Sequence, residues 1–179
     1  ALADTNGAAT GISLQITTAL NGTNTQGTNN PTGDAAEFKP AGADSCFGHN
    51  TVHATPARPQ GVARFSGLNT NIAYTFTFYA SRMGASDDRS ALFALAGLNS
   101  GSNSLNAAGN YAAVAAVSNI LPQTDGTITL TVTKGPSNNN STEYFYVGAI
   151  KVSYVGDAVA EPPAAASGKR LLFFGNSFS

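Results

Sequence analysis

The chain has 179 residues, of which only 11% are charged, and its formal net charge is -1. A surface with so few basic groups cannot follow a phosphate backbone, which excludes nucleic acid as a partner, and no apolar stretch reaches the roughly 18 residues that a membrane span needs. The length suits one domain with a tail, and the abundant Gly, Asn, Ser and Thr favour strands joined by tight turns over helices.

Seven segments are predicted to be strands from their alternation and their β-branched and aromatic content. In chain order they occupy residues 11–17, 61–65, 72–82, 90–95, 111–117, 126–134 and 143–155. Polar runs over residues 21–33, 99–110 and 135–141 are predicted to be turns between them. This organisation predicts an all-β fold, an antiparallel β-sandwich of the jelly-roll type, over residues 1–156. We expect little helix.

The clearest strand covers residues 72–82. Tyr74, Phe76 and Phe78 fall on one face of this strand, which we assign to the core. Tyr79 falls on the opposite face and is predicted to be exposed, with the cation Arg82 at the strand end.

The loop after this strand carries three charged residues, Asp87, Asp88 and Arg89. Together with Tyr79 and Arg82 they form a candidate ligand site, because an exposed ring can stack on a sugar while charged groups bind its hydroxyls. The alternative is a solvated strand end with a local pair between Asp and Arg.

Two later segments complete the sandwich. Residues 126–134 alternate Thr with Ile128, Leu130 and Val132, which predicts a half-buried strand entered through an Asp-Gly turn. Residues 143–155 lose their alternation near Gly148, which indicates either a bulge or two short strands. The single cysteine, Cys46, excludes an intrachain disulfide and is expected to be buried.

Residues 4–7 read Asp-Thr-Asn-Gly, which resembles the beginning of a calcium loop. Asp4 and Asn6 are therefore candidate ligands of a structural calcium ion, with Asp44 or Glu37 as a distant third ligand. The alternative is an Asx turn that closes the first loop. No other cofactor is expected.

The last 23 residues differ in composition from the rest. Residues 157–168 are rich in Ala and Pro, which predicts an interdomain linker, and residues 169–179 read KRLLFFGNSFS, an apolar strand that leads into a Gly-Asn-Ser turn.

The block at residues 169–179 resembles the opening motif of the SGNH (GDSL-like) hydrolases. The resemblance implies that Ser177 is the nucleophile of an esterase domain continuing after Ser179. The Asp-x-x-His pair of that family is absent from this chain, so we do not expect the chain itself to be an enzyme. The alternative is a strand that docks on this domain or on another copy.

The preceding residues resemble an accessory β-sandwich of secreted bacterial proteins. The stretches that carry the resemblance include Tyr74 to Arg82, Gly126 to Leu130 and Tyr146 to Ile150. The resemblance implies an extracellular or cell-surface, non-catalytic module that binds a polysaccharide or glycan beside a carbohydrate-active esterase. Two alternatives stay open: an SGNH-type esterase cut short at its C-terminus, and a surface or filament subunit that self-assembles through its last strand.

Overall fold

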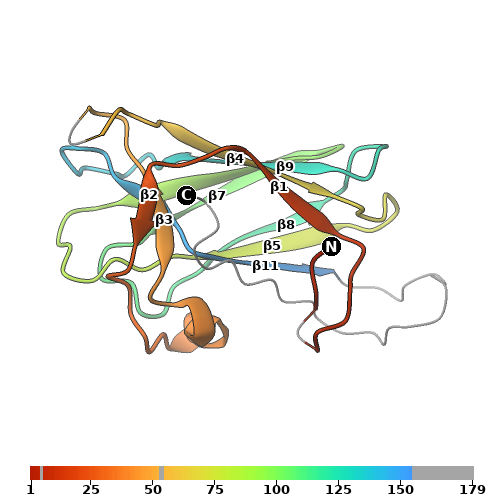
Figure 1. The fold of residues 1–179 in the computed structure, drawn as a ribbon, viewed down its shortest axis with the longest axis horizontal. Coiled ribbons are helices and arrows are strands. Elements are labelled where there is room, and N and C mark those ends of the chain that lie inside the picture. The colour runs from red at the N-terminus through yellow and green to blue at the C-terminus, as the bar shows by residue number, and fades with distance from the viewer. Residues whose placement is uncertain (5, 53–54, 155–179) are drawn as a thin grey trace.

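The protein folds as an antiparallel β-sandwich, as seen in a computed structural model that describes residues 1–4, 6–52 and 55–154 (Figure 1). The first layer is a five-stranded sheet in the order β1-β4-β9-β6-β7. Its strands are β1 (Ser13–Thr18), β4 (Gln60–Ser66), β9 (Ile128–Lys134), β6 (Ser90–Ala96) and β7 (Ser100–Asn106). The expected all-β sandwich is confirmed.

The facing side is built from two three-stranded sheets. One has the order β11-β5-β8 and contains β11 (Ala149–Tyr154), β5 (Tyr74–Tyr79) and β8 (Ala115–Ile120). The other has the order β10-β3-β2 and contains β10 (Phe145–Val147), β3 (Ser45–Gly48) and β2 (Gly22–Asn24). A 3-10 helix, η1 (Gly33–Ala41), lies below β3 in Figure 1.

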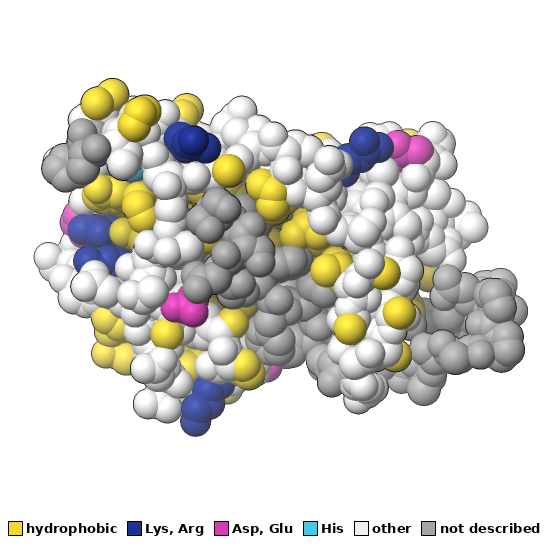
Figure 2. Space-filling view, in the orientation of Figure 1, with side chains coloured by type: hydrophobic (Ala, Val, Ile, Leu, Met, Phe, Trp, Pro, Cys, Tyr) yellow, Lys and Arg dark blue, Asp and Glu magenta, His cyan; other side chains and the backbone are white. Residues whose placement is uncertain are grey.

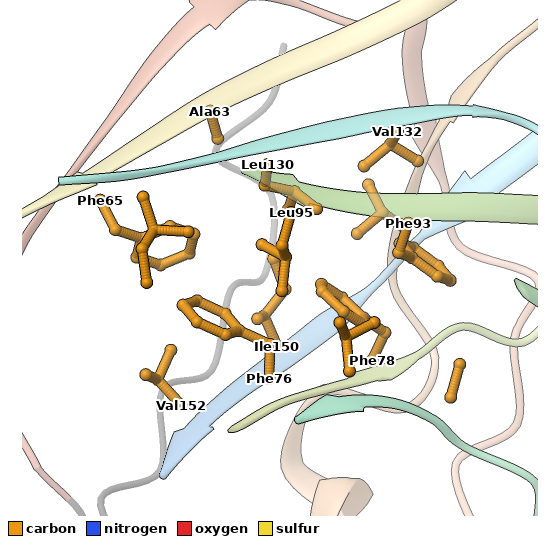
Figure 3. Close-up of a cluster of buried hydrophobic side chains, with 14 of the residues drawn as sticks. Ala63, Phe65, Phe76, Phe78, Phe93, Leu95, Leu130, Val132, Ile150 and Val152 are labelled. Atoms are coloured by element: carbon orange, nitrogen blue, oxygen red, sulfur yellow. The ribbon is translucent and has the colours of Figure 1, made fainter. Parts of the chain in front are cut away.

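The core lies between these layers, and aromatic pairs connect the two sides (Figure 3). The ring of Phe78 on β5 stacks on that of Phe93 on β6, with 4.3 Å between ring centroids. Phe65 on β4 meets Phe76 edge to face at 5.1 Å. All four rings are fully buried. The inward face predicted for the strand at residues 72–82 is therefore confirmed.

The segment predicted over residues 143–155 consists of two strands. Gly148 separates β10 from β11, and its backbone N–H donates to the Tyr79 carbonyl at 3.0 Å. A Cβ atom at this position would lie 2.8 Å from the same carbonyl oxygen, so a larger residue does not fit here. The chain thus changes sheet at a point of close backbone contact.

Three predicted boundaries were wrong. The polar run at residues 99–110 contains β7, an edge strand whose polar side chains face solvent, and residues 21–33 contain β2 and the first residue of η1. The strand predicted at residues 111–117 begins only at Ala115. The alternation of β7 is weak because Leu105 is its only buried residue and most of its other side chains are exposed.

The predicted linker at residues 157–168 and the predicted strand at residues 169–179 lie outside the described residues. Within the described part of the chain, no helix has the length and apolar character required to cross a bilayer.

Candidate ligand-binding site

A pocket opens at the end of the sandwich where the short sheet β10-β3-β2 lies. Its volume is about 430 Å³, within the range of about 300–1,000 Å³ that is common for small-molecule sites. Figure 2 shows basic side chains beside hydrophobic ones at this end of the molecule, next to β2 and β3. The lining residues are Thr23, Asn24, Thr25, Gln26, Phe47, Arg82, Arg89, Tyr144 and Tyr146.

Three aromatic rings form one wall of the pocket. Phe47 on β3 pairs in register with Tyr146 on β10, and Tyr144 precedes Tyr146 by two residues, so the three side chains share a face. Their ring centroids lie 5.6 to 6.5 Å apart, within the usual range for aromatic pairs. The residue between the two tyrosines, Phe145, points the other way and is fully buried in the core. Core packing therefore fixes the aromatic wall from behind.

Arg89 is held against this wall by four contacts. Its Nε donates to Asp87 Oδ1 at 2.8 Å, and its Nη1 donates to the Tyr146 hydroxyl at 2.9 Å. Its guanidinium carbon lies 5.6 Å from the Tyr144 ring centroid, and its backbone N–H donates to Asn106 Oδ1. A guanidinium with two side-chain acceptors and a ring beneath it is well ordered before any ligand arrives.

Electrostatics reinforce this arrangement. The hydrogen bond from Arg89, assisted by one from the Asn140 amide, holds the pKa of Asp87 below its ordinary value. Burial opposes the charge on Arg89, but the hydrogen bonds to Asp87 and Tyr146 outweigh it and raise the pKa of Arg89. Both groups are charged at neutral pH, and they largely neutralise each other.

Arg82 is the second cation in the lining of the pocket. Its backbone N–H donates to the Ala107 carbonyl at 2.7 Å, and its carbonyl accepts from the Gly109 N–H at 3.0 Å. Its side chain donates to the carbonyl of Met83. Among the described residues, no carboxylate forms an ion pair with Arg82.

The structure brings together part of the predicted site. Arg82 and Arg89 line the same pocket, and Asp87 supports it by binding Arg89. Asp88 does not line the pocket, because its Oδ1 accepts from the backbone N–H and the hydroxyl of Ser90 at the start of β6. The alternative of a local pair between Asp and Arg describes Asp87 and Arg89 correctly, and within this pair Arg89 also lines the pocket.

The expectation that Tyr79 is exposed was wrong. Tyr79 is 1% exposed and stacks on Phe38 of η1, with 5.6 Å between nearly parallel rings. Its hydroxyl donates to the carbonyl of Asn110 at 3.3 Å, and burial raises its pKa. A second small core of Ala35, Phe38, Ala41 and Ala149 surrounds the ring, so it is not accessible to a ligand.

Sequence reasoning missed the aromatic wall. Tyr144 and Tyr146 alternate with the apolar Phe145, and this signal could have placed both tyrosines on the face opposite the core, although Tyr146 is itself 3% exposed in a small separate cluster. Phe47 gave no comparable signal, because it reaches the tyrosines only through pairing between strands almost 100 residues apart in the sequence.

The first loop forms the Asx turn that was the alternative to a calcium site. Asp4 Oδ1 accepts the backbone N–H groups of Asn6 and Ala8, both at 2.9 Å. Glu37, a proposed third ligand, instead pairs with Lys151 at 2.5 Å. The described residues contain no cluster of three or more His, Cys, Asp or Glu side chains suited to a metal ion. Calcium binding stays an untested prediction, and Ser177 lies outside the described residues.

No family model matches the chain, and neither does any curated protein or solved structure. Its class is defined by the fold and the site together: an all-β sandwich with an aromatic and basic pocket at one end. Function is therefore inferred from the chemistry of that pocket.

Proposed function

We propose that this domain is a non-catalytic module that binds a glycan in the pocket of Phe47, Tyr144 and Tyr146. The observation that carries the proposal is a pocket whose lining combines two partly exposed rings, Phe47 and Tyr144, backed by the buried Tyr146, with two guanidinium groups. Sugar rings present apolar C–H faces that stack on aromatic rings, and their hydroxyls accept hydrogen bonds from groups such as guanidinium. The chain contains no Trp, so Tyr and Phe supply the stacking surface.

The polar residues of the lining also support glycan binding. Thr23, Asn24, Thr25 and Gln26 add hydroxyl and amide groups from β2 and the residues after it. Such groups donate and accept, as sugar hydroxyls do, and can satisfy a ligand from several directions. Binding of this kind holds an attached hydrolase near its polysaccharide and raises its effective local concentration. The proposed setting is extracellular or at the cell surface.

A glycan array tests the proposal. The full chain is compared with a Tyr144→Ala variant and with a Tyr111→Ala control, since Tyr111 is 51% exposed and does not line the pocket. We expect the chain to bind specific glycans, Tyr144→Ala to weaken them about tenfold, and the control to bind unchanged. Absence of binding across the array, or equal losses in both variants, would refute a glycan site in this pocket.

Two other hypotheses depend on residues 157–179, which lie outside the described part of the chain. The esterase hypothesis predicts that the gene encodes an Asp-x-x-His pair after Ser179. The assembly hypothesis predicts concentration-dependent association that disappears when residues 168–179 are deleted. Both stay predictions.

A further inference from the structure

We propose that the pocket selects glycans bearing a carboxylate, that is, uronic-acid residues, and that Arg82 binds that carboxylate. This inference rests on the proposed glycan-binding function and names the substrate class for the same pocket. It depends on the difference between the two arginines.

Arg89 is neutralised and Arg82 is not. Arg89 forms an ion pair with Asp87 at 2.8 Å and also binds the Tyr146 hydroxyl. Arg82 donates to one backbone carbonyl, that of Met83, and forms no ion pair among the described residues. The pocket lining contains no Asp or Glu. One positive charge in the pocket is therefore uncompensated by the described part of the chain.

A carboxylate is the group that this arrangement fits best. A guanidinium has five N–H donors in a planar fork, and one acceptor leaves most of them available for another group. Carboxylates match the fork with two parallel hydrogen bonds, whereas a neutral hydroxyl uses only one. A uronic acid combines this group with a sugar ring, and the partly exposed rings of Phe47 and Tyr144 line the same pocket and can stack on it.

The anchoring of Arg82 supports a binding role. Its backbone is tied to the segment after β7 by hydrogen bonds to Ala107 and Gly109, and the next residue, Met83, donates its N–H to the Gln26 carbonyl at 2.7 Å. Gln26 is itself a lining residue. The base of the Arg82 side chain is thus fixed relative to Gln26 in the same lining, which lowers the entropic cost of ordering the side chain around a ligand.

The test compares acidic polysaccharides with their neutral counterparts. The full chain is titrated by calorimetry with homogalacturonan, alginate and glucuronoxylan, each beside its carboxyl-reduced form. Because the reduced form differs only in the charged group, the affinity ratio of the pair isolates the contribution of the carboxylate. We expect at least one acidic form to bind at least about tenfold more tightly than its reduced form. Raising NaCl from about 0.1 M to about 1 M, which shortens the Debye length from about 10 Å to about 3 Å, should reduce that ratio.

Three variants assign the effect to Arg82. Arg82→Gln should make the affinities for the acidic and reduced forms equal. Arg82→Lys should lower the affinity ratio but leave that ratio dependent on salt, because an ammonium keeps the charge but lacks the planar fork. Arg64→Gln is the matched control, since Arg64 lies on β4, forms an exposed ion pair with Asp125 and does not line the pocket. Near-UV circular dichroism verifies that each variant is folded. If Arg82→Gln does not fold, the affinity ratio of Arg82→Lys is used in its place.

The outcomes separate this inference from the proposed function. Equal binding of acidic and reduced forms would overturn carboxylate selection but leave the glycan site intact. A loss in Arg64→Gln as large as in Arg82→Gln would show general attraction of polyanions and would also overturn it. Absence of binding to every acidic and reduced form, together with an empty glycan array, would overturn both.

Discussion

Replacing Tyr79 separates a structural aromatic from a ligand-binding one. Its ring is 1% exposed, stacks on Phe38 and belongs to the small core beneath η1. Removal of such a ring costs about 3–5 kcal/mol, so Tyr79→Ala should lose a large part of a typical free energy of unfolding of about 5–15 kcal/mol. Tyr79→Phe removes the 3.3 Å hydrogen bond to the Asn110 carbonyl and the hydrogen bond with the Ser81 side chain, and should cost about 0.5–1.5 kcal/mol for each.

Urea unfolding followed by far-UV circular dichroism measures these free energies, since the chain has no Trp for fluorescence. Glycan affinity is measured in parallel for Tyr79→Phe, which keeps the fold, and for Tyr144→Ala. We expect Tyr79→Phe to bind as tightly as the unchanged chain, and Tyr144→Ala to bind more weakly while losing less stability than Tyr79→Ala. A Tyr79→Ala variant that unfolds at the unchanged urea midpoint, or a Tyr79→Phe variant that loses affinity, would refute the assignment of Tyr79 to the core.

Three further outcomes are expected. Asp87→Asn should lower the melting temperature at neutral pH, and this difference should shrink as the pH falls below the ordinary pKa of 3.8. The hydrogen bond from Arg89 depresses the pKa of Asp87, so its stabilisation is present above the ordinary pKa of 3.8 and is lost as the pH falls through the lower folded value. A difference that grows as the pH falls would contradict this. Gly48→Ala should destabilise the fold by about 1–3 kcal/mol, because the new Cβ would lie 2.4 Å from Phe145 Cζ. A urea midpoint equal to that of the unchanged chain would contradict this, because it would mean that Phe145 moves aside without loss of stability. Chelation by EDTA should leave the melting temperature unchanged, because Asp4 Oδ1 already accepts two backbone N–H groups. A melting temperature that rises with added calcium, and does so no longer in Asp4→Asn, would establish a calcium site.

Local patterns predicted the strands that carry most of the core. The alternation around Phe76 and Phe78 placed both rings in the interior, and the Thr-rich segment from Ile128 to Val132 became the half-buried centre of the five-stranded sheet. The Asx turn at Asp4 was equally readable, because it depends on a side chain and backbone groups only two to four residues away.

The sequence by itself thus determined the fold class, the inward face of the main strands and the presence of Arg82, Asp87 and Arg89 near one strand end. Only the tertiary structure decided that η1 covers Tyr79, and that Phe47 meets Tyr144 and Tyr146 to make a wall for the two arginines. Alternation is a property of one strand and identifies its two faces, but what covers a face depends on segments brought together from far along the chain.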